Sequence, residues 1–311
     1  MPMVSVIIPN YNHAEYLHQR IQSVLDQTWP HFEIIILDDC STDNSKQIIE
    51  EYRYHDKVGA IIFNPVNSGS TFKQWIKGIE VCKSEFVWIA ESDDWCEPTF
   101  LDNIMNGLLK DDTCVFGYCQ SYIIEKINHI KWISNYPYLD GYVEGNKFIK
   151  DFMMPSQAIF NASMVVWRRS AFNKISKEFM DYKFCGDWLF WIEMSMHGNV
   201  FITGKVLNYF RRHDKDVSGK ANLSGDSFLE ELNLFHSLYK RKWISYKDLF
   251  TFLKHEYIAY KAIEKSLKPA KRVAISQLFS SELEHKDALV IYYMGFYSKH
   301  AVKKIFNSLI S

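Results

Sequence analysis

The N-terminal half of the chain alternates continuous apolar runs with amphipathic stretches. Short apolar runs bounded by polar residues predict buried strands, and apolar residues three or four positions apart predict helices. The predicted strands are Val4–Pro9, Glu33–Leu37, Val58–Phe63 and Phe86–Ala90. The predicted helices are Ala14–Asp26, Ser45–Tyr54, Thr71–Cys82 and Pro98–Leu109. This alternation predicts an α/β fold with a largely parallel sheet and helices on both of its faces.

The rest of the chain is first mixed and then helical. Its middle part predicts strands at Val115–Tyr118, Val165–Trp167 and Val206–Phe210, and a helix at Asp187–His197. The polar, aromatic and turn-rich segment Asn128–Gly145 predicts a loop over a binding face. Beyond Gly225 the spacing stays helical to the end. We therefore expect an α/β domain over residues 1–223 and a helical region over residues 224–311.

Two of the predicted strands end in clustered carboxylates. One is followed by Asp38 and Asp39, the other by Glu91, Asp93 and Asp94. In an open α/β sheet, ligands bind beyond the carboxyl ends of the strands, so both clusters are expected at one electronegative mouth. Such a mouth suits a hard divalent cation that carries a phosphate ligand. The alternative is a solvated acidic turn that caps the following helix.

Composition narrows the class of protein. The charged residues nearly cancel, with a net charge of −1. A nucleic-acid partner is not expected, because proteins that bind the phosphate backbone normally carry a basic excess. The six cysteines are scattered without a CxxC pair, and the chain starts directly in a predicted strand. Since no apolar run approaches the roughly 20 residues that span a bilayer, we expect a cytoplasmic protein with reduced thiols.

The first strand-to-helix turn excludes several nucleotide-binding classes. Residues 1–58 contain no glycine, and the first glycine is Gly59. Dinucleotide folds, Walker P-loops and sugar-pyrophosphorylase-like nucleotidyltransferases need glycines in an early turn, so that backbone can approach phosphate. Here the first strand ends in Pro9–Asn12. Tyr11 could stack on a nucleobase while Asp39 accepts a hydrogen bond from its edge; the alternative is an ordinary strand-ending turn.

Two later motifs also carry titratable groups. Asp187 follows Gly186 at the start of a predicted helix. Its carboxylate either serves as a general base or caps the N-terminus of this helix. The run Arg211, Arg212 and His213 follows a predicted strand. These side chains either form a solvated basic turn or reach a diphosphate and its metal.

The order of these motifs is more specific than any one of them. Over roughly residues 3–220 the chain resembles the family 2 inverting glycosyltransferases of GT-A fold. The motifs that carry the resemblance are Pro9–Asn12, Leu37–Asp43, Asn67–Gly69, Glu91–Asp94, Gly186–Asp187 and Phe210–His213. The resemblance implies a Rossmann-like nucleotide-sugar domain with Mn²⁺ or Mg²⁺ held at the acidic turn.

The resemblance also implies roles for individual residues. Asp187 matches the catalytic base. The metal is assigned to Asp93, Asp94 and His213. The donor-binding positions are Pro9, Tyr11, Asp39, Asn67, Asp93, Arg211 and Arg212. Two positions depart from the family pattern, because Cys40 replaces a usual glycine and Glu91 a usual aspartate.

The implied reaction is a single in-line displacement. It moves a sugar from a UDP- or dTDP-sugar to a hydroxyl of a glycan or lipid-linked acceptor, as in surface polysaccharide synthesis. Processive members usually carry membrane spans and a QxxRW motif, so a non-processive enzyme is expected. The alternatives are a catalytically silent nucleotide-sugar binder and a phosphate-receiver module, although a receiver is far shorter and needs its acids after the first strand.

Acceptor and membrane contacts are assigned more coarsely. The segments Asn128–Gly145 and Ser156–Ser163 are candidate acceptor walls. The last residues place Lys299, Lys303 and Lys304 among aromatic and aliphatic side chains. This pattern predicts a basic amphipathic helix for peripheral contact with the inner face of the membrane. Packing on the catalytic domain, or a homodimer contact, is the alternative.

Overall fold

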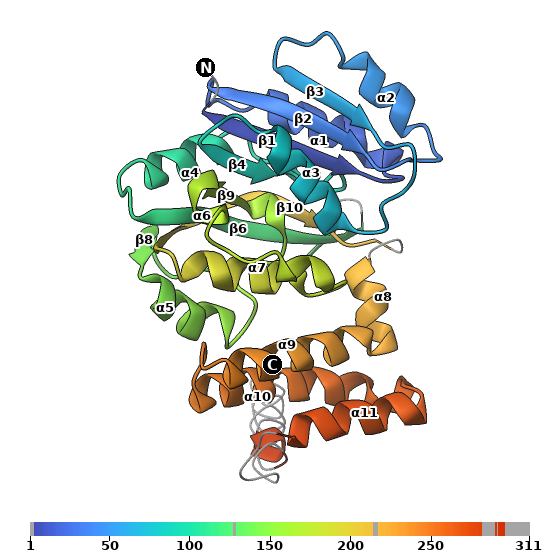
Figure 1. Cartoon of the computed structure of the whole chain (residues 1–311), viewed down its shortest axis with the longest axis vertical. Coiled ribbons are helices and arrows are strands. Elements are labelled where there is room, and N and C mark those ends of the chain that lie inside the picture. Colours follow the sequence, from blue (N-terminus) through green and yellow to red (C-terminus); the bar gives the residue numbers. More distant parts are fainter. Residues whose placement is uncertain (1–2, 127–128, 214–216, 282–289, 291, 296–311) are drawn as a thin grey trace, which may run out of the picture. The chain divides into compact units, whose positions relative to one another are not determined.

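The computed structural model describes residues 3–126, 129–213, 217–281, 290 and 292–295 (Figure 1). The chain forms two compact units. Unit 1 comprises residues 1–149 and 157–213, and unit 2 comprises residues 150–156 and 214–311. The division predicted between residues 223 and 224 stays a prediction.

Within the described residues, ten strands of unit 1 form one mixed sheet. Eight of them follow the order β3-β2-β1-β4-β9-β6-β10-β5, and β7 and β8 pair with β6 and β10 outside this path. The four strands on one side of the sheet are parallel: β1 (Val4–Asn10), β2 (Phe32–Asp38), β3 (Val58–Phe63) and β4 (Phe86–Ile89). The others on this path are β5 (Trp95–Cys96), β6 (Cys114–Lys126), β9 (Val165–Arg168) and β10 (Asn199–Arg211). The predicted α/β class with a mixed sheet is confirmed.

Helices cover both faces of this sheet (Figure 1). On one face the β4 residue Trp88 packs on Phe100 of α4, with ring centroids 4.5 Å apart. On the other face Trp75 of α3 packs on Phe190 of α7 at 5.7 Å. The longer helices are α1 (Ala14–Leu25), α2 (Ser45–Glu51), α3 (Thr71–Val81), α4 (Phe100–Leu108) and α7 (Gly186–Ser195). Shorter turns are α5 (Gly145–Phe148), α6 (Arg169–Phe172), a π-helix at Ile149–Met153 and 3-10 helices at Ala162–Met164 and Glu178–Asp181.

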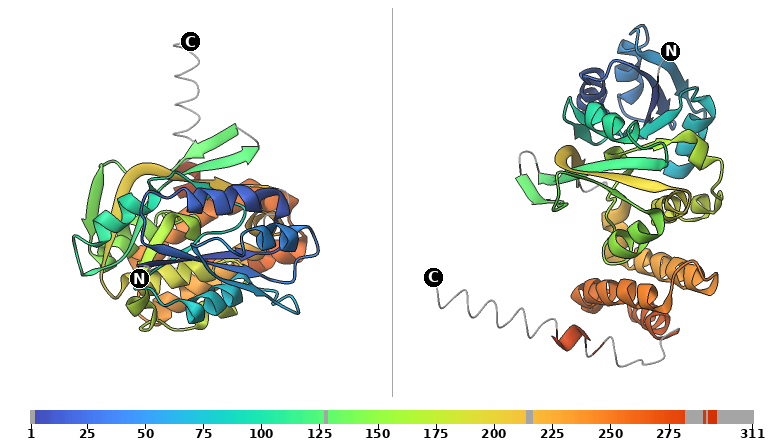
Figure 2. Two further views of the ribbon diagram at one scale, coloured as in Figure 1. Left: turned by 90° about the horizontal axis from the view of Figure 1, so that it is seen from above. Right: turned by 90° about the vertical axis from the view of Figure 1, so that its left-hand side faces the viewer.

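The prediction of a loop over Asn128–Gly145 is wrong. The segment contains β7 (His129–Ile133) and β8 (Asp140–Val143), which pair antiparallel with β6 and β10. All five residues of β7 are exposed, although Ile130 and Trp132 alternate with the polar His129 and Lys131. Figure 2 shows the β6–β7 ribbon extending beyond the rest of unit 1.

Unit 2 is helical in its described part, as predicted. It contains α8 (Val217–Ser224), α9 (Asp226–Lys240), α10 (Tyr246–Ile263), a 3-10 helix (Glu264–Ser266) and α11 (Pro269–Ser280). A capping box between Ser245 and Asp248 starts α10. Phe235 and Phe252 stack between α9 and α10 with centroids 3.7 Å apart.

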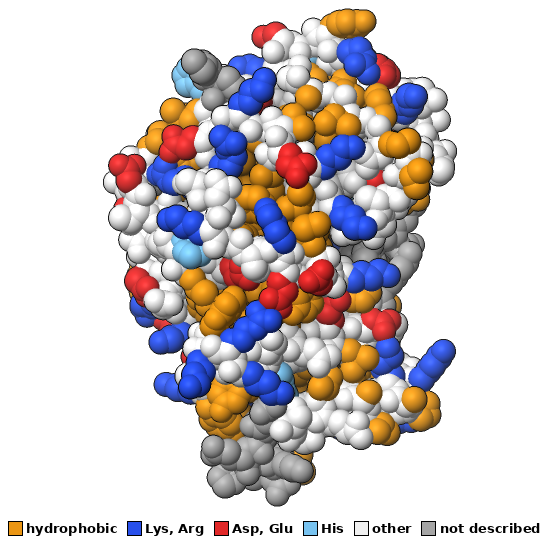
Figure 3. Space-filling view, viewed as in Figure 1, with side chains coloured by type: hydrophobic (Ala, Val, Ile, Leu, Met, Phe, Trp, Pro, Cys, Tyr) orange, Lys and Arg blue, Asp and Glu red, His pale blue; other side chains and the backbone are white. Residues whose placement is uncertain are grey.

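Neither the charge on the surface nor the length of the helices identifies a binding partner. Charged side chains of both signs are interspersed over the face drawn in Figure 3, in keeping with the net charge of −1. In the described part of the chain, every helix is too short or too polar to cross a bilayer. The amphipathic helix predicted around Lys299, Lys303 and Lys304 lies outside the described residues.

Candidate active site

Strand order brings the predicted mouth together. β1 lies between β2 and β4, so the loops that follow these three strands emerge at one edge of the sheet. The loop after β1 is tied to the loop after β2, because Asn10 Nδ2 donates to Asp38 Oδ1 at 2.8 Å and Thr42 N donates to Asn12 Oδ1 at 2.7 Å. Pro9 is buried, whereas Tyr11 is 46% exposed. The Tyr11 side chain is therefore accessible to solvent, and its role in binding a base stays a prediction.

Asp39 is buried and strongly hydrogen-bonded. Its carboxylate accepts from Asn64 Nδ2 at 2.6 Å, Ser68 Oγ at 2.7 Å and Gln74 Nε2 at 2.9 Å. Asn67 joins the same pocket, since its Nδ2 donates to the Asp39 carbonyl at 3.0 Å. These bonds fix the carboxylate between the loop after β2 and the start of α3.

Cys40, which replaces the usual glycine of the family pattern, has an unusual backbone conformation. Its φ is 63°, in the left-handed region that glycine adopts at lower cost. A glycine would suit this backbone better, and the chain places a cysteine there at some conformational cost.

Asp94 is almost fully buried, at 1% exposure. Its Oδ1 accepts from the backbone N–H of Arg211 at 3.0 Å, and its Oδ2 accepts from Asn161 Nδ2. Burial and the neighbouring charge of Asp93 raise the pKa of Asp94 to about 7. Both oxygens thus already bind protein donors, and the assignment of Asp94 as a metal ligand stays a prediction.

Beneath the acidic turn lies Arg20, which the sequence interpretation missed. The side chain is fully buried, and its Nη2 lies 3.9 Å from Asp94 Oδ2. Its Nε donates to the Glu91 carbonyl at 2.8 Å, and its Nη2 to Ser163 Oγ at 3.1 Å. A signal exists in the sequence: Arg20 shares a helical stripe with Leu17 and Val24, which are both buried core residues.

Glu91 turns away from the mouth. Its Oε1 accepts from Trp75 Nε1 on α3 at 2.9 Å. Burial and the charge of Asp93 raise the pKa of Glu91 to about 8. The Glu91 carboxyl is therefore largely protonated near neutral pH and serves as a partner of the α3 indole.

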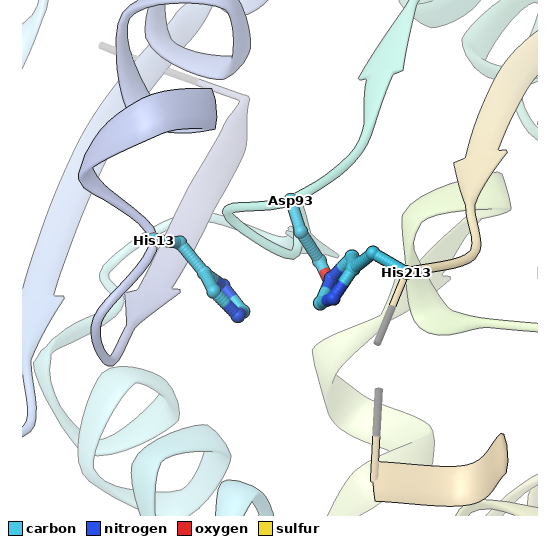
Figure 4. A group of neighbouring side chains, drawn as sticks. All are labelled: His13, Asp93 and His213. Carbon is cyan, nitrogen blue, oxygen red and sulfur yellow. The ribbon is translucent and has the colours of Figure 1, made fainter. Parts of the chain in front are cut away.

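Asp93 lies between two histidines. Nε2 of His213 is 3.1 Å from Asp93 Oδ2, and His13 completes a group whose ligand atoms lie within 4.8 Å of one another (Figure 4). Burial raises the pKa of Asp93, but the His213 hydrogen bond and the charges of His13 and His213 outweigh it, and the pKa falls below its usual value. His13 was missed, although it follows the predicted base-binding Tyr11 by two positions.

The two arginines after β10 differ in their surroundings. Arg211 donates to the Asp93 carbonyl and, through Nη2, to Gln19 Oε1 at 2.7 Å. Its guanidinium lies 4.2 Å from the Tyr16 ring centroid and 4.5 Å from that of Trp95. Arg212 instead lies 5.4 Å from the ring of Phe210. Arg211 is therefore part of the Asp93 cluster.

Asp187 sits in the first turn of α7. Cys185 is the N-cap residue, so Asp187 is not the cap. Its Oδ2 accepts from Gln157 Nε2 at 3.4 Å, which joins it to the segment predicted as an acceptor wall. A Cβ on the preceding Gly186 would lie 2.2 Å from the Phe179 carbonyl oxygen, so only glycine allows this approach. A carboxylate in a first helical turn is stabilised by the helix dipole.

Comparison with known proteins agrees with this geometry. The family model for glycosyl transferase family 2 matches residues 5–176, more than half of the chain. TuaG of Bacillus subtilis (strain 168), a glycosyltransferase named for teichuronic acid biosynthesis, is 34% identical over 117 residues. That match covers 38% of this chain and 46% of TuaG, so the chain spans about half the length of this relative.

Two solved structures share the fold. TarS (residues 1–349) of S. aureus, in complex with UDP-GlcNAc, has a TM-score of 0.70 at 19% sequence identity. The match covers 93% of this chain and 84% of the TarS chain. The mannosyltransferase PcManGT of Pyrobaculum calidifontis, in complex with GDP-Man and Mn²⁺, has a TM-score of 0.56 at 14% sequence identity. The match covers 99% of this chain and 83% of the PcManGT chain. The predicted GT-A fold is confirmed.

Proposed function

The chain belongs to glycosyl transferase family 2, and we propose that it is a non-processive inverting glycosyltransferase. It moves a sugar from a UDP- or dTDP-sugar to a hydroxyl group of a glycan or lipid-linked acceptor. One observation carries the proposal: Asp93, Arg211 and His213 meet where the loop after β4 lies against the carboxyl end of β10. Groups that bind a cation and groups that bind an anion thus share the position where α/β folds bind ligands.

The nucleotide is proposed to bind along the loops after β1 and β2. Tyr11 offers an exposed ring for the base, and Asp39 lies beside it, since the Asp39 N–H donates to the Asn10 carbonyl at 2.9 Å. Asn67 and Pro9 shape this pocket through backbone contacts and burial. TarS was solved with UDP-GlcNAc and PcManGT with GDP-Man on this fold, and the uridine or thymidine diphosphate donor is the one that we propose from the sequence motifs.

The residues at the acidic turn fit a divalent cation. Carboxylate and imidazole are ligands of Mn²⁺, and carboxylate suits Mg²⁺. Asp93 Oδ2 and His213 Nε2 lie 3.1 Å apart, and Asp94 is the further ligand predicted from the sequence. A bound cation would supply a positive charge that offsets the charge of the diphosphate.

The protein side chains have separable roles in the transfer. Asp187 accepts the proton of the acceptor hydroxyl as the oxygen attacks the anomeric carbon, and Gln157 orients its carboxylate. Arg211, held rigidly between Tyr16 and Trp95, is positioned to stabilise charge that grows on the departing nucleoside diphosphate. Arg212 is a second cation for this diphosphate. A single displacement inverts the anomeric configuration, so an α-linked donor gives a β-linkage.

A donor panel tests the proposal. Each nucleotide sugar is incubated with Mn²⁺, Mg²⁺ or EDTA, and the released nucleoside diphosphate is measured together with binding of UDP and dTDP. Slow, EDTA-sensitive release from one donor is expected, because water replaces the acceptor. Binding of a donor without turnover, even with candidate acceptors, would favour the silent nucleotide-sugar binder. Absence of both binding and release would refute the donor site.

The cellular context is proposed from coarser grounds. TuaG is named for teichuronic acid biosynthesis, which favours surface polysaccharide assembly for this chain too. A cytoplasmic location, peripheral contact with the inner face of the membrane, and a homodimer stay predictions. Flotation with anionic liposomes at low salt decides the membrane contact, because a polybasic segment binds such vesicles.

A further inference from the structure

His13 lies where a third protein ligand would stand. Its ligand atom and those of Asp93 and His213 are all within 4.8 Å of one another (Figure 4). Ligands at about 2.1 Å from one octahedral ion lie about 3.0 Å apart when adjacent and about 4.2 Å apart when opposite. Asp93 Oδ2 and His213 Nε2, at 3.1 Å, already have the adjacent spacing. His13 can lie opposite only one of these two ligands, so its ligand atom must move by up to about 2 Å to bind the same ion.

The His13 ring is oriented by its neighbours. Its Nδ1 lies 2.9 Å from Ser92 Oγ, and Ser92 is 1% exposed. Metal-binding histidines almost always hold their second ring nitrogen in such a hydrogen bond, which fixes the tautomer and the ring orientation. With Nδ1 in this bond, Nε2 is the ring nitrogen that we assign to the cation below. The residue that orients His13 is thus the one directly before Asp93.

The backbone around His13 is fixed as well. Asn12 adopts a left-handed φ of 57°, and its N–H donates to Ser41 Oγ at 2.9 Å. On the other side of His13, Ala14 N–H donates to Asp43 Oδ2 at 3.0 Å. The Tyr16 ring then packs against His213 at 5.3 Å. Such a preformed arrangement is what a functional site requires.

We propose that His13 Nε2 is a direct ligand of the cation, together with Asp93 and His213. This inference rests on the proposed function and deepens it. Two imidazoles and one carboxylate form a three-ligand set with open positions for diphosphate oxygens and water. Imidazole favours borderline transition metals, whereas Mg²⁺ prefers oxygen donors. The site therefore selects Mn²⁺ or Co²⁺ over Mg²⁺, and the loop that carries Tyr11 is coupled to the cation.

Pulsed electron paramagnetic resonance on the Mn²⁺-loaded wild-type protein, without nucleotide, tests the ligand set directly. The ¹⁴N modulation of coordinated imidazole counts the histidine ligands. Two coordinated imidazoles are expected, and a single one would overturn the proposal. This measurement needs no variant and no turnover.

Mn²⁺ binding to variants supplies the second test. His13→Ala is expected to weaken Mn²⁺ binding by at least the roughly 10- to 100-fold that is typical when a residue that only orients a ligand is lost. His13→Asp, which supplies a ligand oxygen, is expected to recover affinity while lowering the preference for Mn²⁺ over Mg²⁺. The matched control is His18→Ala, on the same helix segment, whose ring is exposed and contacts Tyr52. Equal Mn²⁺ affinity in His13→Ala and His18→Ala would refute the assignment.

Nucleotide binding separates failure of this inference from failure of the proposed function. UDP and dTDP binding is measured in EDTA for the wild type and for each variant. If the wild type binds nucleotide and Mn²⁺ while the His13 variants keep full Mn²⁺ affinity, only the His13 assignment fails. If the wild type binds neither nucleotide nor Mn²⁺, the proposed function fails with it.

Discussion

Replacing Arg20 with methionine should strongly destabilise unit 1. The guanidinium is fully buried, 3.9 Å from the equally buried Asp94 carboxylate, and its other bonds go to Ser163 and the Glu91 carbonyl. Removing one partner of a buried ion pair leaves an uncompensated charge and costs about 3–5 kcal/mol. Since domains of this kind are stable by about 5–15 kcal/mol, this is a large fraction of the total.

The cost should depend on pH. The pKa of Asp94 is about 7, above its ordinary value, because burial and Asp93 favour the protonated form while Arg20 opposes this. Without Arg20 the pKa of Asp94 rises further. The Arg20→Met defect is therefore small well below pH 7, where Asp94 is neutral in both proteins, and grows as the pH rises through 7.

Urea unfolding followed by tryptophan fluorescence measures this effect in unit 1. Every tryptophan except Trp243 belongs to this unit. EDTA is included so that no cation compensates the acids, and the free energy of unfolding is compared at about pH 5.5 and about pH 8.5. Asp94→Asn in the Arg20→Met background should recover about 1–3 kcal/mol, because the two side chains are coupled.

A surface arginine provides the control. Arg53 pairs with Glu50 at the exposed end of α2, and Arg53→Met should leave the unfolding midpoint unchanged. If Arg20→Met costs less than about 1 kcal/mol, or costs the same at both pH values, the Asp94–Arg20 pair does not carry the charge of the buried turn.

Further predictions concern α7 and unit 2. Asp187→Asn should retain donor affinity but lose about 10²- to 10⁴-fold in transfer rate; near wild-type turnover would remove Asp187 as the base. Gly186→Ala should cost about 1–3 kcal/mol of stability, because its Cβ would meet the Phe179 carbonyl; an unchanged thermal midpoint would contradict this. Burial raises the pKa of Glu256 to about 7. The free energy of unfolding of unit 2 therefore falls as the pH rises from the ordinary pKa of a glutamate to about 7. Glu256→Gln should therefore stabilise unit 2 by about 1–3 kcal/mol at about pH 8 and little at about pH 4.5, measured by circular dichroism during urea unfolding; an equal gain at both would refute the assignment.

Strands that are buried on both faces could be predicted from the sequence. Every residue of β1 is buried, so its apolar run is continuous and its end at the mouth is visible in the sequence. The same reasoning located β2 and β4, and their order around β1 then places both acid clusters at one edge. The first half of the fold follows from local pattern alone.

The full length of β6 could not be predicted, because the strand contains buried polar residues. β6 was predicted to end at Tyr118, but it continues through Gln120 and Ser121, which are polar and buried. Gln120 Nε2 donates to the Thr203 carbonyl on β10 at 3.1 Å. Such polar positions break an apolar pattern, and only the partner strand shows why they are inside.

The candidate site likewise contains residues that the sequence predicted and residues that it did not. Asp93, Asp94 and His213 belong to sequence motifs and were predicted, whereas Asn161 and Ser163 were assigned only as part of the candidate acceptor wall Ser156–Ser163, not as partners of the acidic turn. These two reach the acidic turn through contacts about 70 positions apart in sequence, to Asp94 and to the Glu91 N–H. A single sequence carries no record of such pairings, because neither residue type nor spacing marks them.

Burial contradicts one of the two interpretations of the acidic turn, the solvated helix cap, while the cation site stays a prediction. A solvated cap would be exposed and would bond the first turn of α4, yet α4 begins after Thr99 without a side-chain cap. Asp94 is buried instead, and the pKa values of Asp94 and Glu91 are raised to about 7 and about 8. Clustered acids with raised pKa values destabilise a fold and are typical of functional sites. One buried arginine offsets part of this charge, and a divalent cation at Asp93 would offset the remainder only when the site is loaded, which couples the stability of the mouth to ligand binding.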